Sequence, residues 1–111
     1  MPQYPYLELG ISIGTWDTVA DVYPDNGFEG GLAIPFHLRH EIFAEPYLER
    51  VKTADGKVHA VPAWPGIVEI AGSRVRVQVL GLGDRFLIGR EVLDQFEVCF
   101  MFGRRVAVRP E

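Results

Sequence analysis

The fold of this chain is decided by residues 22–35, which read VYPDNGFEGGLAIP. An apolar strand leads into one carboxylate, Asp25, and breaks at once on the pair Asn26-Gly27. The chain then crosses a Gly-Gly pair and continues as a second apolar run at residues 32–34. Because asparagine and glycine adopt positive φ at low cost, the pattern predicts a single acid on a tight loop between two buried strands.

A plain turn is the alternative interpretation of residues 24–27, since Pro, Asp, Asn and Gly are the commonest turn formers. Pro24 also affects the shape of the loop, because proline cannot donate to a ladder and favours edges, strand starts and bulges. We therefore expect either that the first strand ends at Tyr23 or that its ladder is broken beside Asp25.

A second segment, at residues 86–93, reads FLIGREVL and combines an apolar strand end, a glycine and a short helical turn. Together the two segments resemble the retropepsin-like aspartic peptidases, the family of the retroviral proteases and their bacterial relatives. That family has Asp-Thr/Ser-Gly, then a glycine-rich apolar run, and near the C-terminus Ile/Leu-Ile/Leu-Gly-Arg/Met-Asp/Asn/Glu-x-Leu. Here the two motifs are Asp25-Asn26-Gly27 and residues 87–93, and the resemblance spans residues 7–102.

The resemblance implies an all-β fold: a closed retropepsin-like β-barrel with a flap hairpin and one or two short helices, in a single domain over residues 1–111. It implies that Asp25 is catalytic and that Asn26, Gly27, Glu29 and Arg90 line or support the substrate cleft. Glu29 and Arg90 are expected to pair beneath the site, as a carboxylate with an arginine fork. In the family, a hydroxyl at position 26 resembles a latch, because it bonds across the dimer to main chain beneath the two acids. Asn26 takes the place of that hydroxyl here, so this contact between subunits is either formed by the amide or lost.

A hairpin is predicted around Thr53-Ala54-Asp55-Gly56, because Asp-Gly between two strand-like runs is a strong turn signal. In the resembled family the hairpin at this place in the chain is the flap that closes over the substrate. Its tip would be Ala54, Asp55 and Gly56, with Gly56 giving a bound peptide access to the backbone. A plain exposed hairpin is the alternative.

Several other runs alternate apolar and polar residues with the period of two that is typical of half-buried strands. In residues 74–80, three valines alternate with Arg74, Arg76 and Gln78, which predicts one buried face and one basic, solvent-exposed face. Pro65-Gly66 and Ala71-Gly72-Ser73 are expected to be turns, and short strands with frequent turns indicate a β-barrel. The expected core consists of Leu9, Ile11, Val22, Leu32, Ile34, Ile70, Val77, Val79, Leu87, Ile88 and Leu93.

The composition fits one soluble domain, with 111 residues, 48% of them hydrophobic and 23% charged. No apolar run approaches the roughly 20 residues of a membrane span, and the first residues are unlike a secretory signal. We therefore expect a cytoplasmic protein without a membrane partner. The net charge is −4 and no long basic run is present. A nucleic-acid partner is not expected, because the phosphate backbone needs a continuous basic footprint.

Neither a metal nor a cofactor is expected. His37, His40 and Glu41 have a spacing that a metal site could use. Such a site needs further ligands from elsewhere in the chain, and His59 is the one other histidine. We therefore interpret the three residues as solvent-exposed surface positions. The single cysteine, Cys99, lies in an apolar run and is interpreted as a small buried hydrophobe rather than a catalytic thiol.

Peptide hydrolysis by carboxylates needs two acids that share a proton, and this chain offers only Asp25 in a suitable setting. The first hypothesis is therefore a homodimeric aspartic peptidase that hydrolyses peptide bonds, with Asp25 facing Asp25 of the partner subunit across a two-fold axis. The second is a catalytically impaired protease-fold module that binds a peptide or a partner protein, which Pro24 and Asn26 favour. The third is a monomeric barrel in which Asp25 is purely structural.

Overall fold

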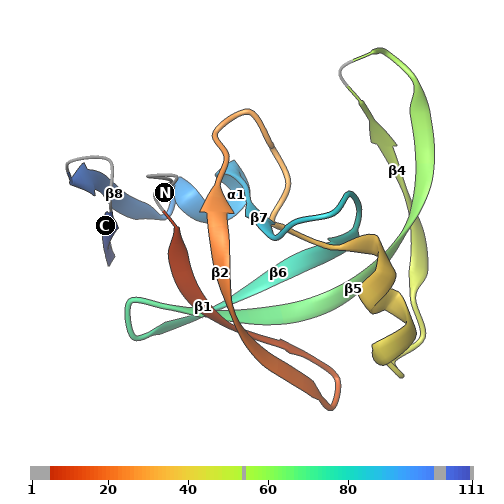
Figure 1. Cartoon of the computed structure of the whole chain (residues 1–111), viewed down its shortest axis with the longest axis horizontal. Coiled ribbons are helices and arrows are strands. Elements are labelled where there is room, and N and C mark those ends of the chain that lie inside the picture. Colours follow the sequence, from red (N-terminus) through yellow and green to blue (C-terminus); the bar gives the residue numbers. More distant parts are fainter. Residues whose placement is uncertain (1–5, 54, 102–104, 111) are drawn as a thin grey trace.

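The computed structural model describes residues 6–53, 55–101 and 105–110, with residues 97–101 and 105–110 described through their backbone. In chain order the elements are β1 (Leu7–Ile13), β2 (Trp16–Pro24), β3 (Leu32–Ile34), the 3₁₀ helix η1 (Phe36–Glu41), β4 (Tyr47–Lys52), β5 (Val58–Ile70), β6 (Ser73–Gly81), β7 (Leu87–Ile88), α1 (Arg90–Leu93), β8 (Phe96–Met101) and β9 (Arg105–Pro110) (Figure 1). Within these residues no helix is long and apolar enough to cross a membrane.

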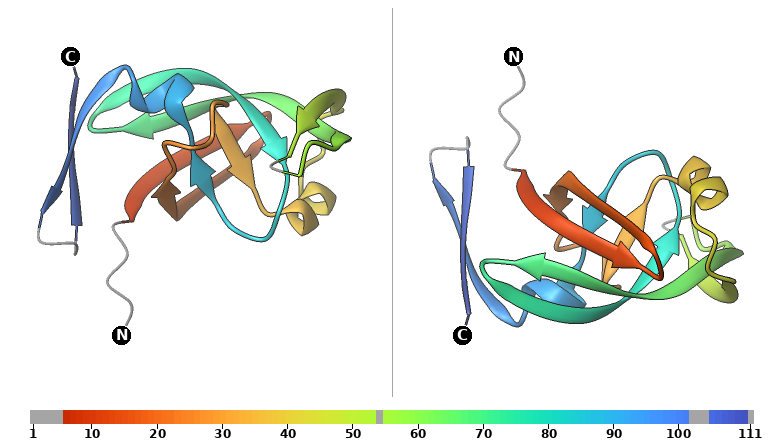
Figure 2. Two further views of the ribbon diagram at one scale, coloured as in Figure 1. Left: turned by 90° about the horizontal axis from the view of Figure 1, so that it is seen from above. Right: turned by 90° about the horizontal axis from the view of Figure 1, so that it is seen from below.

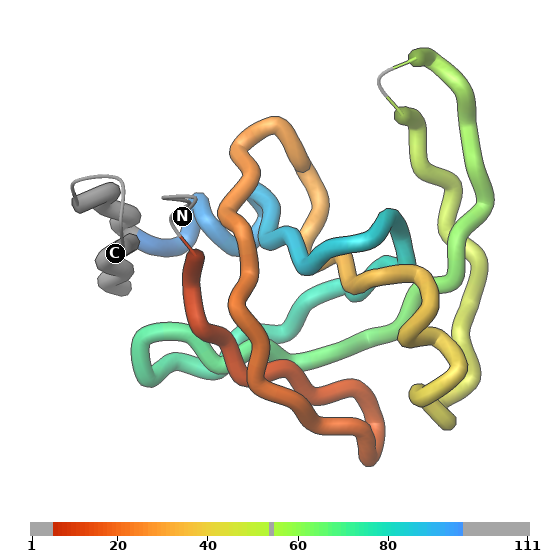
Figure 3. Tube along the Cα trace, in the orientation of Figure 1, coloured from red at the N-terminus to blue at the C-terminus, as the bar shows by residue number. Residues whose placement is uncertain are grey.

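Six strands close into a barrel. Neighbouring strands follow the order β1-β2-β7-β3-β6-β5, and β5 returns to pair with β1, at Gly10↔Glu69 among other positions. The strand β4 pairs only with the first part of β5, so these two form a hairpin that projects from the barrel (Figure 3). The predicted closed, all-β barrel is thus confirmed.

The last two strands stand apart from the barrel. β8 pairs with β9 in a separate two-stranded antiparallel sheet. In both views of Figure 2 this sheet and the β4–β5 hairpin lie at opposite ends of the molecule. Cys99 belongs to β8, and its expected burial concerns a side chain that lies outside the described residues.

The short strand β7 brings the two sequence motifs together. It lies between β2, to which it is parallel at Tyr23↔Leu87, and β3, to which it is antiparallel at Leu32↔Ile88. Its two residues therefore contact both strands that flank the loop of Asp25. This arrangement explains why two segments that are separated by residues 36–85 form one structural unit.

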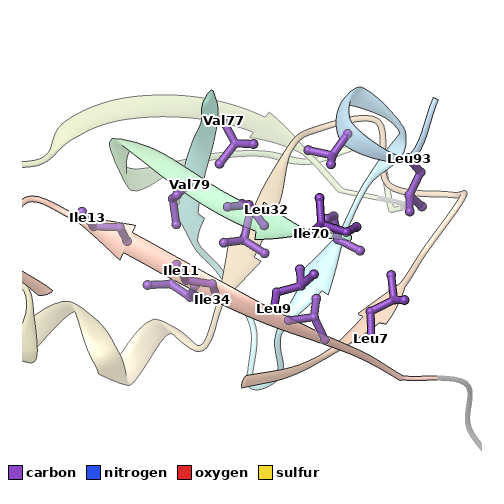
Figure 4. Packing of buried hydrophobic residues seen from close by; sticks show 14 of the residues in the cluster. Leu7, Leu9, Ile11, Ile13, Leu32, Ile34, Ile70, Val77, Val79 and Leu93 are labelled. Carbon is purple, nitrogen blue, oxygen red and sulfur yellow. The ribbon is translucent and has the colours of Figure 1, made fainter. Parts of the chain in front are cut away.

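The barrel is filled by the apolar residues of the period-two strands, because alternate side chains of a strand point to the same face. In β1 the four buried positions are Leu7, Leu9, Ile11 and Ile13 (Figure 4). All residues of the expected core are buried except Leu87, which is half-buried. The reason is that β7 has only two residues, and Ile88 takes the inward position.

One large core residue, Trp64, is not among those that the sequence predicts. Trp64 is 1% exposed and its Nε1–H donates to the carbonyl oxygen of Ala44 over 3.0 Å. The ring is thereby buried with its one polar atom satisfied, as buried tryptophans generally require. Trp64 follows no alternating pattern that would have marked it, because Pro62 and Pro65 lie on either side of it within β5.

The expected turn at Pro65-Gly66 is wrong. Strand β5 runs through both residues, with Pro65 opposite Gln78 and Gly66 opposite Val77. A Cβ on Gly66 would lie only 2.7 Å from Val79 Cγ2 and 3.1 Å from the Ser12 carbonyl oxygen. The glycine is therefore needed for close packing, at the point where β5 leaves the hairpin with β4 and joins β1. The other expected turn, at residues 71–72, is present.

The start of α1 is bonded to the loop that follows Asp25. The N–H groups of Gly89, Arg90 and Glu91 donate to the carbonyl oxygens of Gly31 (2.8 Å), Phe28 (2.8 Å) and Gly30 (3.3 Å). A Cβ on Gly89 would lie 2.2 Å from the Gly30 oxygen and 2.5 Å from the Phe28 oxygen. Only glycine fits here, because those two backbone oxygens cannot move away without breaking two of the three bonds.

We predict that Gly89→Ala lowers the free energy of unfolding by at least about 2 kcal/mol, because the added methyl group forces these bonds apart. Urea unfolding at fixed protein concentration measures the change. Gly10→Ala is the matched control, since its Cβ would make an ordinary contact at 3.4 Å with Glu69 Cβ. Equal effects of the two substitutions would show that the contact at Gly89 does not constrain the fold.

Candidate active site

The acid of the first motif is placed by the ladder between β2 and β7. The Tyr23 N–H donates to the Phe86 carbonyl oxygen over 3.0 Å, and the Asp25 N–H donates to the Ile88 carbonyl oxygen over 2.9 Å. In a parallel ladder only every second residue of a strand bonds to a given neighbouring strand. Tyr23 and Asp25 are the residues that bond to the β7 side, so the ladder needs no N–H from position 24 there. The backbone of Asp25 is thus tied directly to the second motif.

Pro24 does not disturb this geometry. It is buried, it belongs to β2, and it pairs with Ile88. On the other side of β2 the register with β1 ends at Leu7↔Val22, two residues earlier. The expectation that the strand ends at Tyr23 or that the ladder breaks is therefore wrong, because β7 bonds to Tyr23 and Asp25 and needs no N–H at position 24.

The carboxylate of Asp25 is oriented by its own loop. The Gly27 N–H donates to Asp25 Oδ1 over 2.8 Å, and the Phe28 N–H donates to the Asp25 carbonyl oxygen over 3.1 Å. This is the local bonding by which Asp stabilises turns. The second oxygen, Oδ2, accepts no hydrogen bond from any residue that the structure describes, and Asp25 is half-buried. One oxygen is fixed and the other is free to act on a ligand.

Glu29 and Arg90 lie close along the backbone, but their side chains do not form the expected ion pair. The Arg90 N–H bonds to the carbonyl oxygen of Phe28, the neighbour of Glu29. The Arg90 guanidinium instead lies 3.7 Å from the Asp94 carboxylate, one helical turn away. Glu29 is exposed and has no ion pair within the described part of the chain. Asn26 is exposed as well, beside the acid.

The predicted hairpin is formed by β4 and β5, with Lys52 opposite Val58 as the last pair. The Thr53 N–H donates to the Lys57 carbonyl oxygen over 2.9 Å, and the Gly56 N–H donates to the Thr53 carbonyl oxygen over 2.9 Å. Gly56 has φ +83 with open space around it. Ala54, the third residue assigned to the tip, lies outside the described residues.

Asp55 holds the tip of this hairpin in shape. Its Oδ1 accepts hydrogen bonds from the Thr53 hydroxyl and from the Lys57 N–H, the latter over 3.1 Å. The Thr53 hydroxyl, followed by the Lys57 N–H, lowers the pKa of Asp55 below its ordinary value of 3.8, because both donors favour the charged carboxylate. At neutral pH the side chain is thus an ionised acceptor inside its own turn.

A groove of about 560 Å³ runs between the loop of Asp25 and the projecting hairpin. Its walls come from three places: the loop at Gly27, Phe28, Glu29 and Gly30, the strand β4 with Thr53, and the side of β6 that carries Gln78 and Leu80. Gly27 therefore links the groove to the carboxylate, since it lines the one and bonds to the other. Asp55 and Gly56 are not among the lining residues.

Glu49, Gln78 and Leu80 line the groove, but the sequence did not predict that they would. The alternation in residues 74–80 predicts that Gln78 is solvent-exposed together with Arg74 and Arg76, and those two are exposed. Gln78 is half-buried, because the β4–β5 hairpin folds over its end of β6. Leu80 is the residue that could have indicated this in the sequence, because it is apolar and lies on the same face of β6 as Gln78.

The described residues contain no group of three His, Cys, Asp or Glu side chains that could hold a metal ion. His37 and His40 lie exposed on η1, and His59 lies exposed on β5. The polar side chains among the residues that line the groove include Glu29, Glu49, Thr53 and Gln78. Such a set suits the binding of a peptide beside an acid.

Comparison with known proteins places the fold. No protein-family model and no curated protein matches the sequence. The solution structure of simian foamy virus (mac) protease has a TM-score of 0.56 and 19% identity, over 80% of this chain and 91% of that chain. EIAV protease complexed with the inhibitor HBY-793 has a TM-score of 0.61 and 17% identity, over 82% of this chain and 86% of that chain. The chain thus has the retropepsin-like fold of the retroviral proteases, as its two motifs indicated.

Proposed function

We propose that this protein is an aspartic peptidase-like hydrolase that acts as a homodimer, with Asp25 of each subunit forming the catalytic pair. The observation that carries the proposal is the hydrogen bond from the Gly27 N–H to Asp25 Oδ1. Because Gly27 also lines the groove, the carboxylate is fixed beside a groove in which a peptide can lie. The retropepsin-like fold supports the same assignment.

The chemistry requires a second carboxylate. In peptide hydrolysis of this kind the ionised acid takes a proton from water, and the neutral acid polarises the peptide carbonyl. A two-fold axis next to Asp25 supplies the second group as Asp25 of the partner subunit. Two carboxylates only a few ångströms apart do not both ionise easily, so the pair keeps the one proton that the mechanism uses.

Asn26 favours a second candidate function, in which the groove binds a peptide or partner protein without hydrolysis. Asn26 takes the place of the latch hydroxyl of the resembled family, and its longer side chain is exposed in the single chain. Pro24 gives no further support to this candidate, since the backbone at Asp25 is intact. The two candidates share the groove and differ only in the chemistry at Asp25.

Hydrolysis is tested by incubating the protein with an unstructured protein between about pH 4 and pH 7, where a shared proton is retained. We expect peptide fragments with the wild type and none with Asp25→Asn, which keeps the shape and removes the charge. Mass spectrometry of the products measures both. Fragments that persist with Asp25→Asn would exclude Asp25 as the catalytic group, and a wild type that binds peptide without cleaving it would support the second candidate.

Asp25→Asn should leave the dimer equally strong or stronger at pH 7, because the substitution removes the repulsion between the two carboxylates. Sedimentation over a range of protein concentrations measures the dissociation of the dimer. A clearly weaker dimer would mean that Asp25 is a structural acceptor. A wild type that stays monomeric at high concentration would support a purely structural role and exclude the shared pair.

The tip of the hairpin should stay ordered over the whole range of that assay and loosen only in stronger acid. The pKa of Asp55 is lowered by folding, so its stabilising effect is complete above the ordinary value of 3.8 and is lost as the pH falls through the lowered pKa. The NMR signals of the Lys57 and Gly56 amides report this change. In Asp55→Asn the signals should lose their pH dependence, and a transition above pH 5 in the wild type would contradict the assignment.

A further inference from the structure

The polar side chains on the inner side of the groove present acceptors. Gln78 Nε2 donates to Glu49 Oε2 over 2.9 Å and to the Tyr47 hydroxyl oxygen over 3.0 Å. Both N–H bonds of the amide are therefore in use, and its Oε1 is the polar atom that is left. Glu49 is half-buried and is held in place by this bond, with its Oε1 still available.

A second carboxylate lines the same groove from the loop of Asp25. Glu29 is exposed, and its side chain makes no hydrogen bond or ion pair within the described residues. The acceptors thus come from two separate elements: Glu49 from β4 and Glu29 from the loop. A donor that enters the groove meets a carboxylate that is already oriented and another that can move to meet it.

The groove also has an apolar floor. Leu80 is 3% exposed and packs in a small core with Val61 and Ala63, against which Phe28 and Val51 are packed. Of these residues Phe28, Val51 and Leu80 line the groove. A ligand group that suits this surface has an apolar stem and a donor at its end.

The two basic residues of β4 do not neutralise this arrangement. Arg50 and Lys52 alternate with Glu49, Val51 and Thr53, and alternate side chains of a strand point to opposite faces. The cross-strand neighbours of Arg50 and Lys52 are Ala60 and Val58, all of them exposed. Strand alternation therefore directs both side chains to the outer face of the hairpin, although the two residues are among those that line the groove.

From these observations we infer that the groove is a specificity site for a long basic side chain of the bound peptide, lysine or arginine. The stem lies along Phe28, Val51 and Leu80, and the cation is bound by Glu49 with Glu29. This inference rests on the proposed function, because it concerns the same groove. Glu49 and Gln78 are specificity residues and take no part in the chemistry at Asp25.

Binding to the Asp25→Asn variant tests this inference without hydrolysis. The ligands are octapeptides in which one lysine is moved along an otherwise neutral sequence, and each is paired with the same peptide carrying norleucine, which keeps the stem and lacks the cation. Fluorescence anisotropy gives the two dissociation constants. At one position of the scan the lysine peptide should bind about tenfold more tightly, as a partly buried, charge-assisted hydrogen bond provides.

The preference should disappear in Glu49→Gln, which can still accept the bond from Gln78. It should persist in the control Glu8→Gln, which changes an exposed carboxylate on β1. In the unmodified groove the preference should shrink as salt is added, because an ion pair at the groove is screened. Equal binding of lysine and norleucine peptides at every position, no binding of any lysine peptide, or a preference that survives Glu49→Gln would overturn the inference.

The result is separable from that of the hydrolysis assay. A lysine preference in a protein that cleaves nothing supports the specificity site and refutes the peptidase. Cleavage with no preference between lysine and norleucine supports the peptidase and refutes the specificity site.

Discussion

The three hydrogen bonds between residues 89–91 and the loop at residues 28–31 are the constraint on which the site depends. They exist because Gly89 has no side chain, so that two backbone oxygens can approach it. The loop is then held at both ends, by the Asp25 N–H on the Ile88 carbonyl oxygen and by the Gly89 N–H on the Gly31 carbonyl oxygen. A carboxylate on such a loop has a fixed position, which is what preorganised acid–base chemistry requires.

One wall of the groove, in contrast, comes from a hairpin that the barrel holds less tightly. Strand β4 pairs only with β5, and the hairpin meets the rest of the molecule through the small core of Leu80, Val61 and Ala63 and through the Gln78 side chain. The free energy of local opening is lowest for segments that few buried contacts join to the rest of the protein. The protein thus combines a rigid element that carries the acid with a more open element that contacts the ligand.

Much of the fold was predictable from the sequence, because period-two strands, the Asp-Gly hairpin and the two glycine-containing motifs are local signals. The expectations from the sequence were wrong at positions where pairing between distant parts of the chain determines the structure. Pro24 keeps the ladder with β7 intact because β7 bonds to Tyr23 and Asp25, and Pro65-Gly66 stays extended because both residues pair with β6. Arg90 pairs with Asp94 rather than Glu29. Gln78 and Glu49 are 29 residues apart, and no local pattern places them in one groove.

The central claim is that each site needs Asp25 from two chains, and mixing subunits tests it most directly. Equal amounts of wild type and Asp25→Asn are combined at constant total concentration, allowed to exchange subunits, and assayed for peptide hydrolysis. If one shared pair forms each site, only wild-type homodimers are active, and about a quarter of the wild-type rate should remain. A rate near three quarters would mean that one Asp25 per dimer suffices, and a rate near one half would mean that each subunit acts independently. Either result would contradict the account.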